Sequence, residues 1–213
     1  GDVTKSHQGV HHAVYTDDTQ LYIIFKQGEH TESLKQLSHC VADIQTWSSQ
    51  NSPQLNASKT EVLHVTSQFR TPQPIPQIHI VHDNITPSET VRDLGVTLDN
   101  QLTLQKHIKN TCRSAAFGLY KIGKLRRYLD QSTTERLVHA FITSHLDYCN
   151  SLYINLPQSH IAPLQRMQNS AARLVSRKKK SDHFRGTKNF FFLTYFVLGR
   201  PEASCIKSGV AEL

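Results

Sequence analysis

The sequence has few cysteines, no paired metal-ligand motif and no apolar run long enough to cross a membrane. Its four cysteines form no Cys-x-x-Cys pair and its thirteen histidines include no His-Glu-x-x-His motif, so neither a zinc site nor a disulfide scaffold is indicated. The apolar stretch Phe190–Leu198 is about half of the ~18 residues that a membrane span needs. The first residues form no signal peptide. We therefore predict a protein of a reducing intracellular compartment, nucleus or cytoplasm, without a membrane partner.

Acidic residues are missing from two long stretches in the second half of the chain. Residues 1–99 carry 6 Lys and Arg against 11 Asp and Glu, whereas residues 100–213 carry 18 against 6. None of these acids lies between Asn100 and Leu129 or between Ser151 and Lys180. A solvated basic face is one explanation, but two acid-free stretches favour contact with nucleic acid, because cations placed on phosphates release condensed counterions. The cations of the first stretch are Lys106, Lys109, Arg113, Lys121, Lys124, Arg126 and Arg127.

The first hundred residues combine strand-like segments with one helical segment. β-branched and aromatic residues on both sides of Thr16–Gln20 predict a hairpin over residues 12–25 with two carboxylates at its tip. Apolar residues three or four positions apart predict an amphipathic helix over residues 31–50 with one buried stripe. That stripe consists of Leu34, Leu37, Val41, Ile44 and Trp47. Short strands are predicted over residues 61–66, 77–81 and 91–98, the last with Gly95 inside it.

From residue 104 the apolar period becomes helical. It predicts helices over residues 104–122, 132–149 and 161–175. The second is expected to begin at the capping-box pattern Ser132–Glu135, and Pro163 is expected near the first turn of the third. The fold class is therefore α+β, with a β-rich part over residues 1–100 and a helical part over residues 101–181. Residues 182–213 follow neither pattern, and we expect them to be disordered or to derive from a mis-assigned exon.

An Asp-Asp pair, Asp17 and Asp18, occupies the predicted hairpin tip. A tight turn presents both carboxylates together, and like charges side by side are tolerated mainly when a divalent cation neutralises them. Two such cations, about 3.5–4 Å apart, can activate a 3′-hydroxyl and stabilise a leaving pyrophosphate in an in-line displacement. The dipeptide alone is weak evidence, since most such pairs are solvated turns.

Several segments, in order, resemble one family of polymerases. Tyr15-Thr16-Asp17-Asp18 is similar to the Tyr-x-Asp-Asp motif of reverse transcriptases of non-LTR, LINE-type or jockey-like retrotransposons, with Thr16 where Ala is usual. Later palm segments of that family resemble residues 42–48, 55–63 and 94–99, and its thumb and post-thumb helices resemble residues 137–152 and 164–174. The resemblance implies part of a polymerase palm followed by an α-helical thumb bundle, from an RNA-directed DNA polymerase.

The resemblance also implies roles for individual residues. Asp17 and Asp18 would hold Mg²⁺ or Mn²⁺, with Tyr15 near the incoming nucleotide or the primer end. Lys59 matches a lysine near the triphosphate, where a general-acid role is conceivable; a surface lysine is the equal alternative. A hairpin of Leu94, Gly95 and Val96 would grip the primer, because glycine permits close backbone approach. The implied partners are an RNA template, a DNA primer and a deoxynucleoside triphosphate.

A two-metal site needs a third carboxylate, which the family supplies from an earlier palm strand. The chain begins at Gly1 without an initiator Met, so we expect a fragment that is inactive by itself. A second hypothesis is a non-catalytic, basic nucleic-acid-binding remnant of a transposable element. A third is a genomic relic without a biological role.

Overall fold

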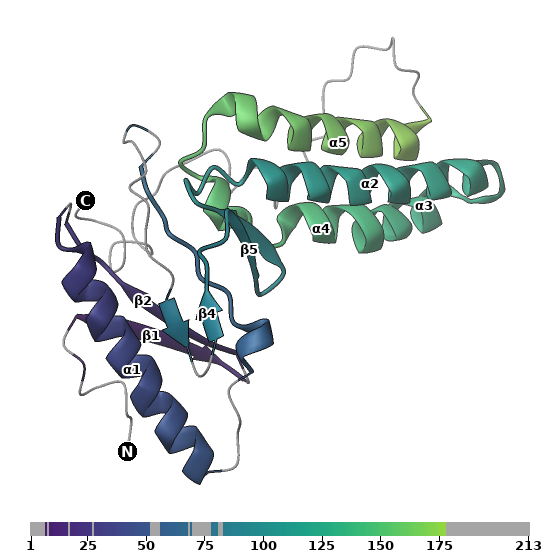
Figure 1. The fold of residues 1–213 in the computed structure, drawn as a ribbon. Helices are drawn as coiled ribbons and strands as arrows, with labels where there is room; N and C mark the ends of the chain where they lie inside the picture. The colour runs from purple at the N-terminus through teal and green to yellow at the C-terminus, as the bar shows by residue number, and fades with distance from the viewer. Residues whose placement is uncertain are drawn as a thin grey trace. The chain divides into compact units, whose positions relative to one another are not determined.

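The chain is a mixed α+β protein with small antiparallel sheets and mainly helical structure (Figure 1). The computed structural model describes residues 7, 9–16, 18–26, 28–51, 56–67, 69, 78–80 and 83–177. These fall into unit 1, Gly1–Val91 with Asp99–Leu102, and unit 2, Arg92–Leu98 with Thr103–Leu213. The predicted boundaries at residues 100 and 181 stay predictions, and the stretch Phe190–Leu198 lies outside the described residues. None of the helices within the described ranges is long and apolar enough to span a bilayer.

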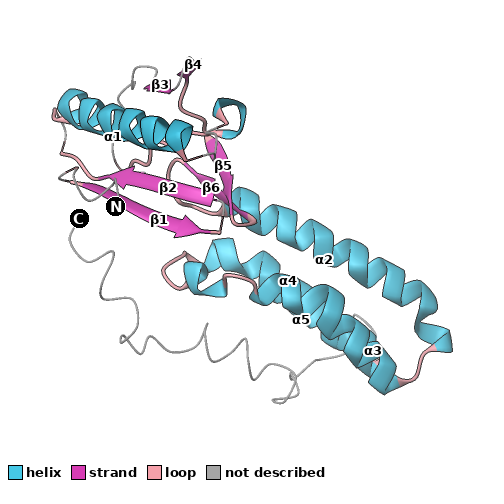
Figure 2. Cartoon of the chain, turned by 90° about the horizontal axis from the view of Figure 1, so that it is seen from below, coloured by secondary structure: helices cyan, strands magenta, loops and turns pink. Residues whose placement is uncertain are grey.

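Unit 1 combines one long helix with short strands (Figure 2). Its elements are β1 (Val10–Tyr15), β2 (Asp18–Ile23), α1 (His30–Gln50), η2 (Ala57–Lys59), β3 (Ile78–Ile80) and β4 (Asp83–Ile85). Strands β1 and β2 pair antiparallel, as do β3 and β4, and α1 packs against β1, β2 and β3. The predicted hairpin, helix and strand near residue 78 are therefore confirmed. The strand expected over residues 61–66 is not formed, because Leu63 makes only an isolated bridge to Ser88.

The apolar stripe of α1 is buried less than predicted. The buried residues of this helix are Cys40 and Ser48, and Trp47 is 43% exposed. Two-stranded sheets offer a helix little surface to cover. Among the described residues of unit 1, the buried apolar side chains are thus Val10, Cys40 and Ile78.

A second hairpin replaces the single strand predicted over residues 91–98. Strand β5 (Thr90–Asp93) pairs with β6 (Val96–Asp99). Two of the boundaries between unit 1 and unit 2 along the chain fall within these two strands. Leu94 and Gly95 connect the strands with φ angles of 43° and 85°. Positive φ at both central residues is what a type I′ turn requires. The sequence pattern was therefore wrong about one continuous strand, whereas the family resemblance correctly implied a hairpin here.

The helical part of unit 2 is a bundle in which α2 and α5 run in the same direction and the α3–α4 segment runs back between them (Figure 2). Its elements are α2 (Gln105–Leu125), η3 (Arg126–Tyr128), α3 (Gln131–Val138), the π-helical turn η4 (His139–Thr143), α4 (Ser144–Asp147), η5 (Asn150–Tyr153) and α5 (Gln158–Ser176). Helix α2 packs against α5, α3, α4 and η4. The three predicted helices are confirmed, although the middle one contains a π-helical turn that the apolar period did not indicate.

Two local predictions in the bundle were wrong. Helix α3 begins after Asp130, whose carboxylate accepts the backbone N–H of Thr133 at 3.0 Å. Ser132 is therefore not the N-cap, and its hydroxyl donates to Asp130 instead; an Asp two residues earlier provides the better acceptor. Pro163 lies in the second turn of α5, which begins at Gln158, and not in the first.

Unit 2 is held together by one continuous apolar core. Burial of a Leu, Ile or Val side chain stabilises a fold by about 1.5–3 kcal/mol, so a cluster of this size holds the bundle firmly. Its buried members are Val96, Leu104, Ile108, Ala115, Ile122, Val138, Ile142, Leu146, Tyr153, Ile161, Leu164, Ala171 and Val175.

Candidate functional site

The β1–β2 hairpin displays Asp18 directly after its two-residue turn. Tyr15 and Asp18 are register partners, and both are exposed, Tyr15 to 65%. Thr16 has a φ of 54°, in the left-handed region where a β-branched residue is strained. Asp17, the predicted principal metal ligand, lies outside the described residues.

The hairpin is open to solvent along most of β1. Val10 is buried, but every later residue of this strand is exposed, and Val14 is 63% exposed. His11 stacks on Tyr22 across the hairpin with ring centroids 5.1 Å apart, a cross-strand contact that supports the register. Among the residues that the structure describes, no three His, Cys, Asp or Glu side chains are grouped so as to hold a metal ion.

Lys59 lies on the short helical turn η2 and is exposed. The turn is organised by Asn56, whose side-chain oxygen accepts the backbone N–H and the hydroxyl of Ser58 at 3.0 and 2.6 Å. Thr60 donates to the Asn56 carbonyl at 3.0 Å. An Asx turn of this kind fixes the backbone locally, so Lys59 projects from an ordered loop.

The turn of the β5–β6 hairpin is fastened to the helical bundle by a tyrosine. The Tyr148 hydroxyl donates to the Leu94 carbonyl at 2.5 Å. A side chain at Gly95 would place its first carbon 3.5 Å from the Tyr148 ring. Leu94 and Gly95 are exposed, whereas Val96 is 5% exposed and belongs to the apolar core. The Val96 side chain therefore anchors the hairpin in the core and is not available to a nucleic acid, and the predicted contact of this hairpin with a primer stays a prediction.

His107 is the second link between this hairpin and the bundle. Its Nδ1 accepts the backbone N–H of Thr97 at 3.3 Å, and its ring lies 6.2 Å from that of Tyr153. Burial lowers the pKa of the imidazole below its ordinary value. Nδ1 accepts a hydrogen bond only when it carries no proton, so the neutral ring is the form that supports the hairpin.

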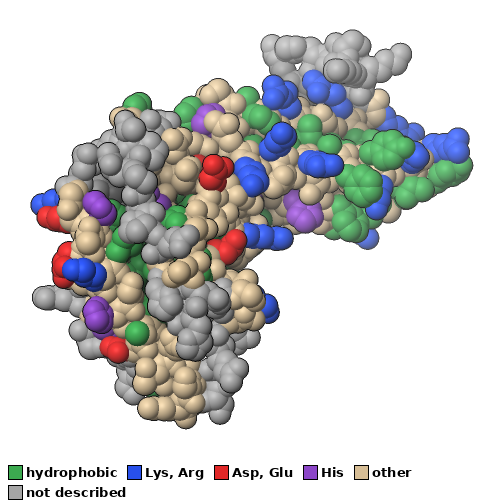
Figure 3. Space-filling view, viewed as in Figure 1, with side chains coloured by type: hydrophobic (Ala, Val, Ile, Leu, Met, Phe, Trp, Pro, Cys, Tyr) green, Lys and Arg blue, Asp and Glu red, His purple; other side chains and the backbone are tan. Residues whose placement is uncertain are grey.

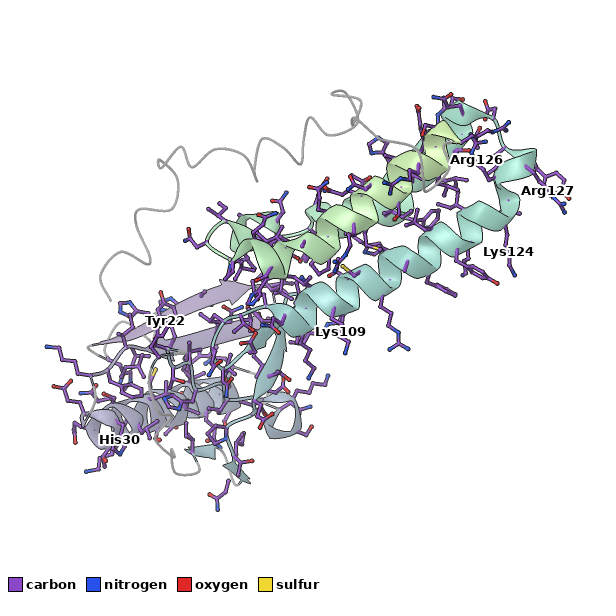
Figure 4. All side chains as sticks on the ribbon, turned by 90° about the horizontal axis from the view of Figure 1, so that it is seen from above. Tyr22, His30, Lys109, Lys124, Arg126 and Arg127 are labelled. Atoms are coloured by element: carbon purple, nitrogen blue, oxygen red, sulfur yellow. The ribbon has the colours of Figure 1, made fainter. Side chains whose placement is uncertain are left out.

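One face of α2 is basic and exposed, and the opposite face is buried. Ile108, Ala115 and Ile122, each seven residues from the next, face the core. Exposed Lys and Arg occupy the other side, and Figure 4 shows Lys109 and Lys124 projecting from the side of α2 away from α5. No acidic residue occurs in this helix. The exposed cations of α2 are Lys106, Lys109, Arg113, Lys121 and Lys124.

Exposed aromatic rings lie among these cations, and they were not among the residues predicted from the sequence. The Lys121 ammonium lies 4.3 Å from the Phe117 ring centroid, and that of Lys124 lies 4.6 Å from the Tyr120 centroid. Both rings are 59% exposed. In Figure 3, apolar side chains gather between Lys and Arg side chains at this end of the bundle. The available signal was the four-residue spacing of each ring and cation, which places them on one helix face.

Arg126 does not belong to the basic surface, although the sequence placed it there. Its side chain is 9% exposed, and its guanidinium donates to the carbonyls of Leu174, Leu129 and Val175 at 2.8–2.9 Å. The bonds to Leu174 and Val175 satisfy carbonyls at the end of α5. Arg127 is exposed and lies 4.6 Å from the Tyr128 ring, so the two neighbours have different surroundings.

Comparison with known proteins gives one distant similarity. The chain is 27% identical over 125 residues to the probable RNA-directed DNA polymerase from transposon X-element of Drosophila melanogaster. The match covers 57% of this chain and 13% of that protein. No family model matches the chain, and no solved structure matches it. The chain is thus distantly and partially similar to a transposon reverse transcriptase.

Proposed function

We propose that this chain is a piece of the RNA-directed DNA polymerase of a non-LTR retrotransposon. Residues 1–100 are the C-terminal half of a palm, and the helices over residues 101–181 are a thumb that holds the template–primer. The observation that carries this proposal is the β1–β2 hairpin, which presents exposed Asp18 directly after a two-residue turn that follows Tyr15. The distant similarity to the X-element polymerase supports it.

In this proposal Asp17 and Asp18 contribute carboxylates to a pair of Mg²⁺ or Mn²⁺ ions in the full polymerase. Such ions supply Lewis-acid chemistry to nucleotidyl transfer. Tyr15, exposed beside the turn, contacts the primer end or the nucleotide. Lys59, on its ordered turn, lies at the triphosphate and serves as a proton donor to the leaving group.

The role of unit 2 is to hold the polyanion. The exposed cations of α2 and Arg127 have no acidic residue beside them in α2. A basic surface of this kind attracts phosphates. The turn of Leu94 and Gly95, fastened by Tyr148, is the part of this unit that approaches the primer backbone. A non-catalytic binding module is the second candidate function, and the same basic face of α2 favours it.

A binding experiment with a recessed RNA template–DNA primer distinguishes the two. The polymerase proposal expects that the two carboxylates of this chain bind at least one Mg²⁺ ion without the third. Mg²⁺ at constant ionic strength should then strengthen binding in the presence of the complementary nucleotide, and Asp17→Asn with Asp18→Asn should remove this gain. Glu61→Gln, an exposed acid elsewhere in unit 1, is the matched control. An identical Mg²⁺ response in the aspartate variant would contradict the catalytic role and leave the binding module.

The contribution of α2 is tested by the salt dependence of the same binding. Lys109→Gln with Arg113→Gln should reduce the slope of log K against log salt by roughly one for each cation removed. Arg136→Gln removes an exposed cation from α3 and should leave the slope unchanged. Equal slopes for all three proteins would show that α2 does not contact the phosphates.

A further inference from the structure

The exposed face of α2 carries more than positive charge. The aromatic–basic stripe consists of Arg113, Phe117, Tyr120, Lys121 and Lys124, each of which lies three or four residues from at least one other member. Pairs at this spacing lie on one helix face, with Cβ atoms about 5–6 Å apart. The stripe is therefore a continuous surface in which two rings lie among three cations.

We infer that the aromatic–basic stripe of α2 binds single-stranded nucleic acid, with unpaired bases stacked on Phe117 and Tyr120 and phosphates held by the neighbouring cations. This inference rests on the proposed nucleic-acid role of unit 2. It specifies single-stranded nucleic acid as the ligand of the stripe. Duplex bases already stack on each other and present no free faces, whereas the bases of a single strand do.

The composition of the stripe argues against a protein partner. The centre of a protein–protein interface is depleted in charged residues, but here a cation stands over each ring, Lys121 over Phe117 and Lys124 over Tyr120. A polyanion that also carries π-faces complements both features at once.

The lysines that cover the rings do not prevent stacking. An exposed cation–π contact shifts an equilibrium by about two- to fivefold, whereas stacking of a base on an aromatic side chain shifts it by about five- to a hundredfold. A base therefore displaces the ammonium from the ring, and the freed lysine is then within reach of the adjoining phosphate.

A third exposed ring lies on a turn that packs against α2. Phe141 lies in the π-helical turn η4 and is 55% exposed. A side chain on Gly118 of α2 would place its first carbon 3.4 Å from the Phe141 carbonyl and 3.8 Å from its Cβ. Glycine thus allows η4 to approach α2 closely at the residue that follows Phe117. Single-turn π-helices are frequent at functional sites.

The test compares three ligands on the intact chain by fluorescence anisotropy: a single-stranded RNA 20-mer, an abasic oligomer of the same length and a blunt RNA–DNA hybrid. Phe117→Ala with Tyr120→Ala should weaken binding of the RNA by at least about tenfold and change binding of the other two by less than about twofold. Phe69→Ala, which removes an 88% exposed ring outside the stripe, should change none. Circular dichroism checks that each variant keeps its helices.

A second variant keeps a ring in place and reports stacking directly. Phe117→Trp should retain binding, and single-stranded RNA, but not the abasic oligomer, should quench its added fluorescence. Equal losses for the RNA and the abasic oligomer, or absence of quenching, would overturn the inference while hybrid binding persists. If the unaltered chain binds none of the three ligands, the proposed nucleic-acid function fails together with it.

Discussion

Units 1 and 2 differ in the number of buried apolar side chains that support their exposed candidate site residues. In the described part of unit 1 the buried apolar side chains are Val10, Cys40 and Ile78, whereas thirteen buried residues form one cluster in unit 2. Each large apolar side chain contributes about 1.5–3 kcal/mol when it is buried. The difference in buried apolar side chains between the two units is therefore large compared with the roughly 5–15 kcal/mol that stabilises a typical domain. Among the described residues, unit 2 therefore has the larger apolar core with which to fold cooperatively.

The difference bears on the proposed function. The hairpin with Asp18 belongs to the unit with fewer buried apolar residues in its described part, and the basic face of α2 belongs to the unit with more. Segments that bind ligands are commonly drawn from the less stable parts of a protein. We therefore expect nucleic-acid binding by α2 to persist under conditions in which the β1–β2 hairpin is already unfolded.

The largest effect expected is the removal of a core side chain from unit 2. Ile142→Ala should lower the free energy of unfolding by about 2–5 kcal/mol, because Ile142 is fully buried among α2, α3 and α4. Hydrogen exchange of the α2 and α5 amides measures it. Trp47→Ala in unit 1, at a site that is 43% exposed, should lower protection in its own helix by a smaller amount. A larger loss at Trp47 would invert the ranking of the two units.

Arg126 and Arg127 form the sharpest matched pair within unit 2. Arg126→Ala should destabilise the bundle by about 2 kcal/mol or more, because charged hydrogen bonds to three carbonyls are lost. Arg127→Ala should leave thermal stability unchanged and weaken binding of RNA or of the hybrid. The two effects are read from a melting curve and a binding curve. If Arg126→Ala lost affinity without losing stability, Arg126 would be a nucleic-acid contact after all.

The residue pattern was informative where period alone determines structure. The alternation around Thr16–Gln20 predicted the hairpin, and the helical period over 31–50 and 104–122 predicted the ends of α1 to within one residue and those of α2 to within three. These elements depend on local sequence, so a single chain suffices to find them. The extent of burial depends on tertiary contacts and not on local sequence. The apolar stripe of α1 was therefore predicted to be more buried than it is.

The errors concern features that only tertiary contacts decide. Nothing in the basic run Lys124–Arg127 distinguishes a buried cation from exposed ones; the end of α5, some fifty residues later, does so by offering Arg126 its carbonyls. The turn at Leu94 and Gly95 likewise depends on Tyr148, far along the chain. Roles for Asp17, Asp18 and Lys59 came from the family resemblance and stay predictions.

A smaller effect is expected at the link between the β5–β6 turn and the bundle. Tyr148→Phe removes the hydrogen bond to the Leu94 carbonyl and should cost about 0.5–1.5 kcal/mol. If this turn contacts the primer, affinity for the recessed template–primer should fall while affinity for single-stranded RNA does not. Tyr128→Phe, at an exposed ring beside Arg127, is the control. Equal losses for both ligands would mean that the turn has no particular role at the primer.

The smallest expected effect is the pH dependence contributed by His107. Because burial lowers its pKa in the folded protein, the unfolded chain takes up this proton first as pH falls, and the unfolded state is then favoured. The contribution of the neutral ring should be complete above its ordinary pKa, near 6.5, and should decline as pH falls below it. Protonation of Nδ1 also removes the acceptor for Thr97, so the β5–β6 hairpin should loosen together with the bundle. His107→Asn keeps an acceptor without a titrating group, and its urea midpoint should fall less between pH 7 and pH 5 than that of the unaltered chain. Parallel curves for the two proteins would show that other groups govern the acid sensitivity of unit 2.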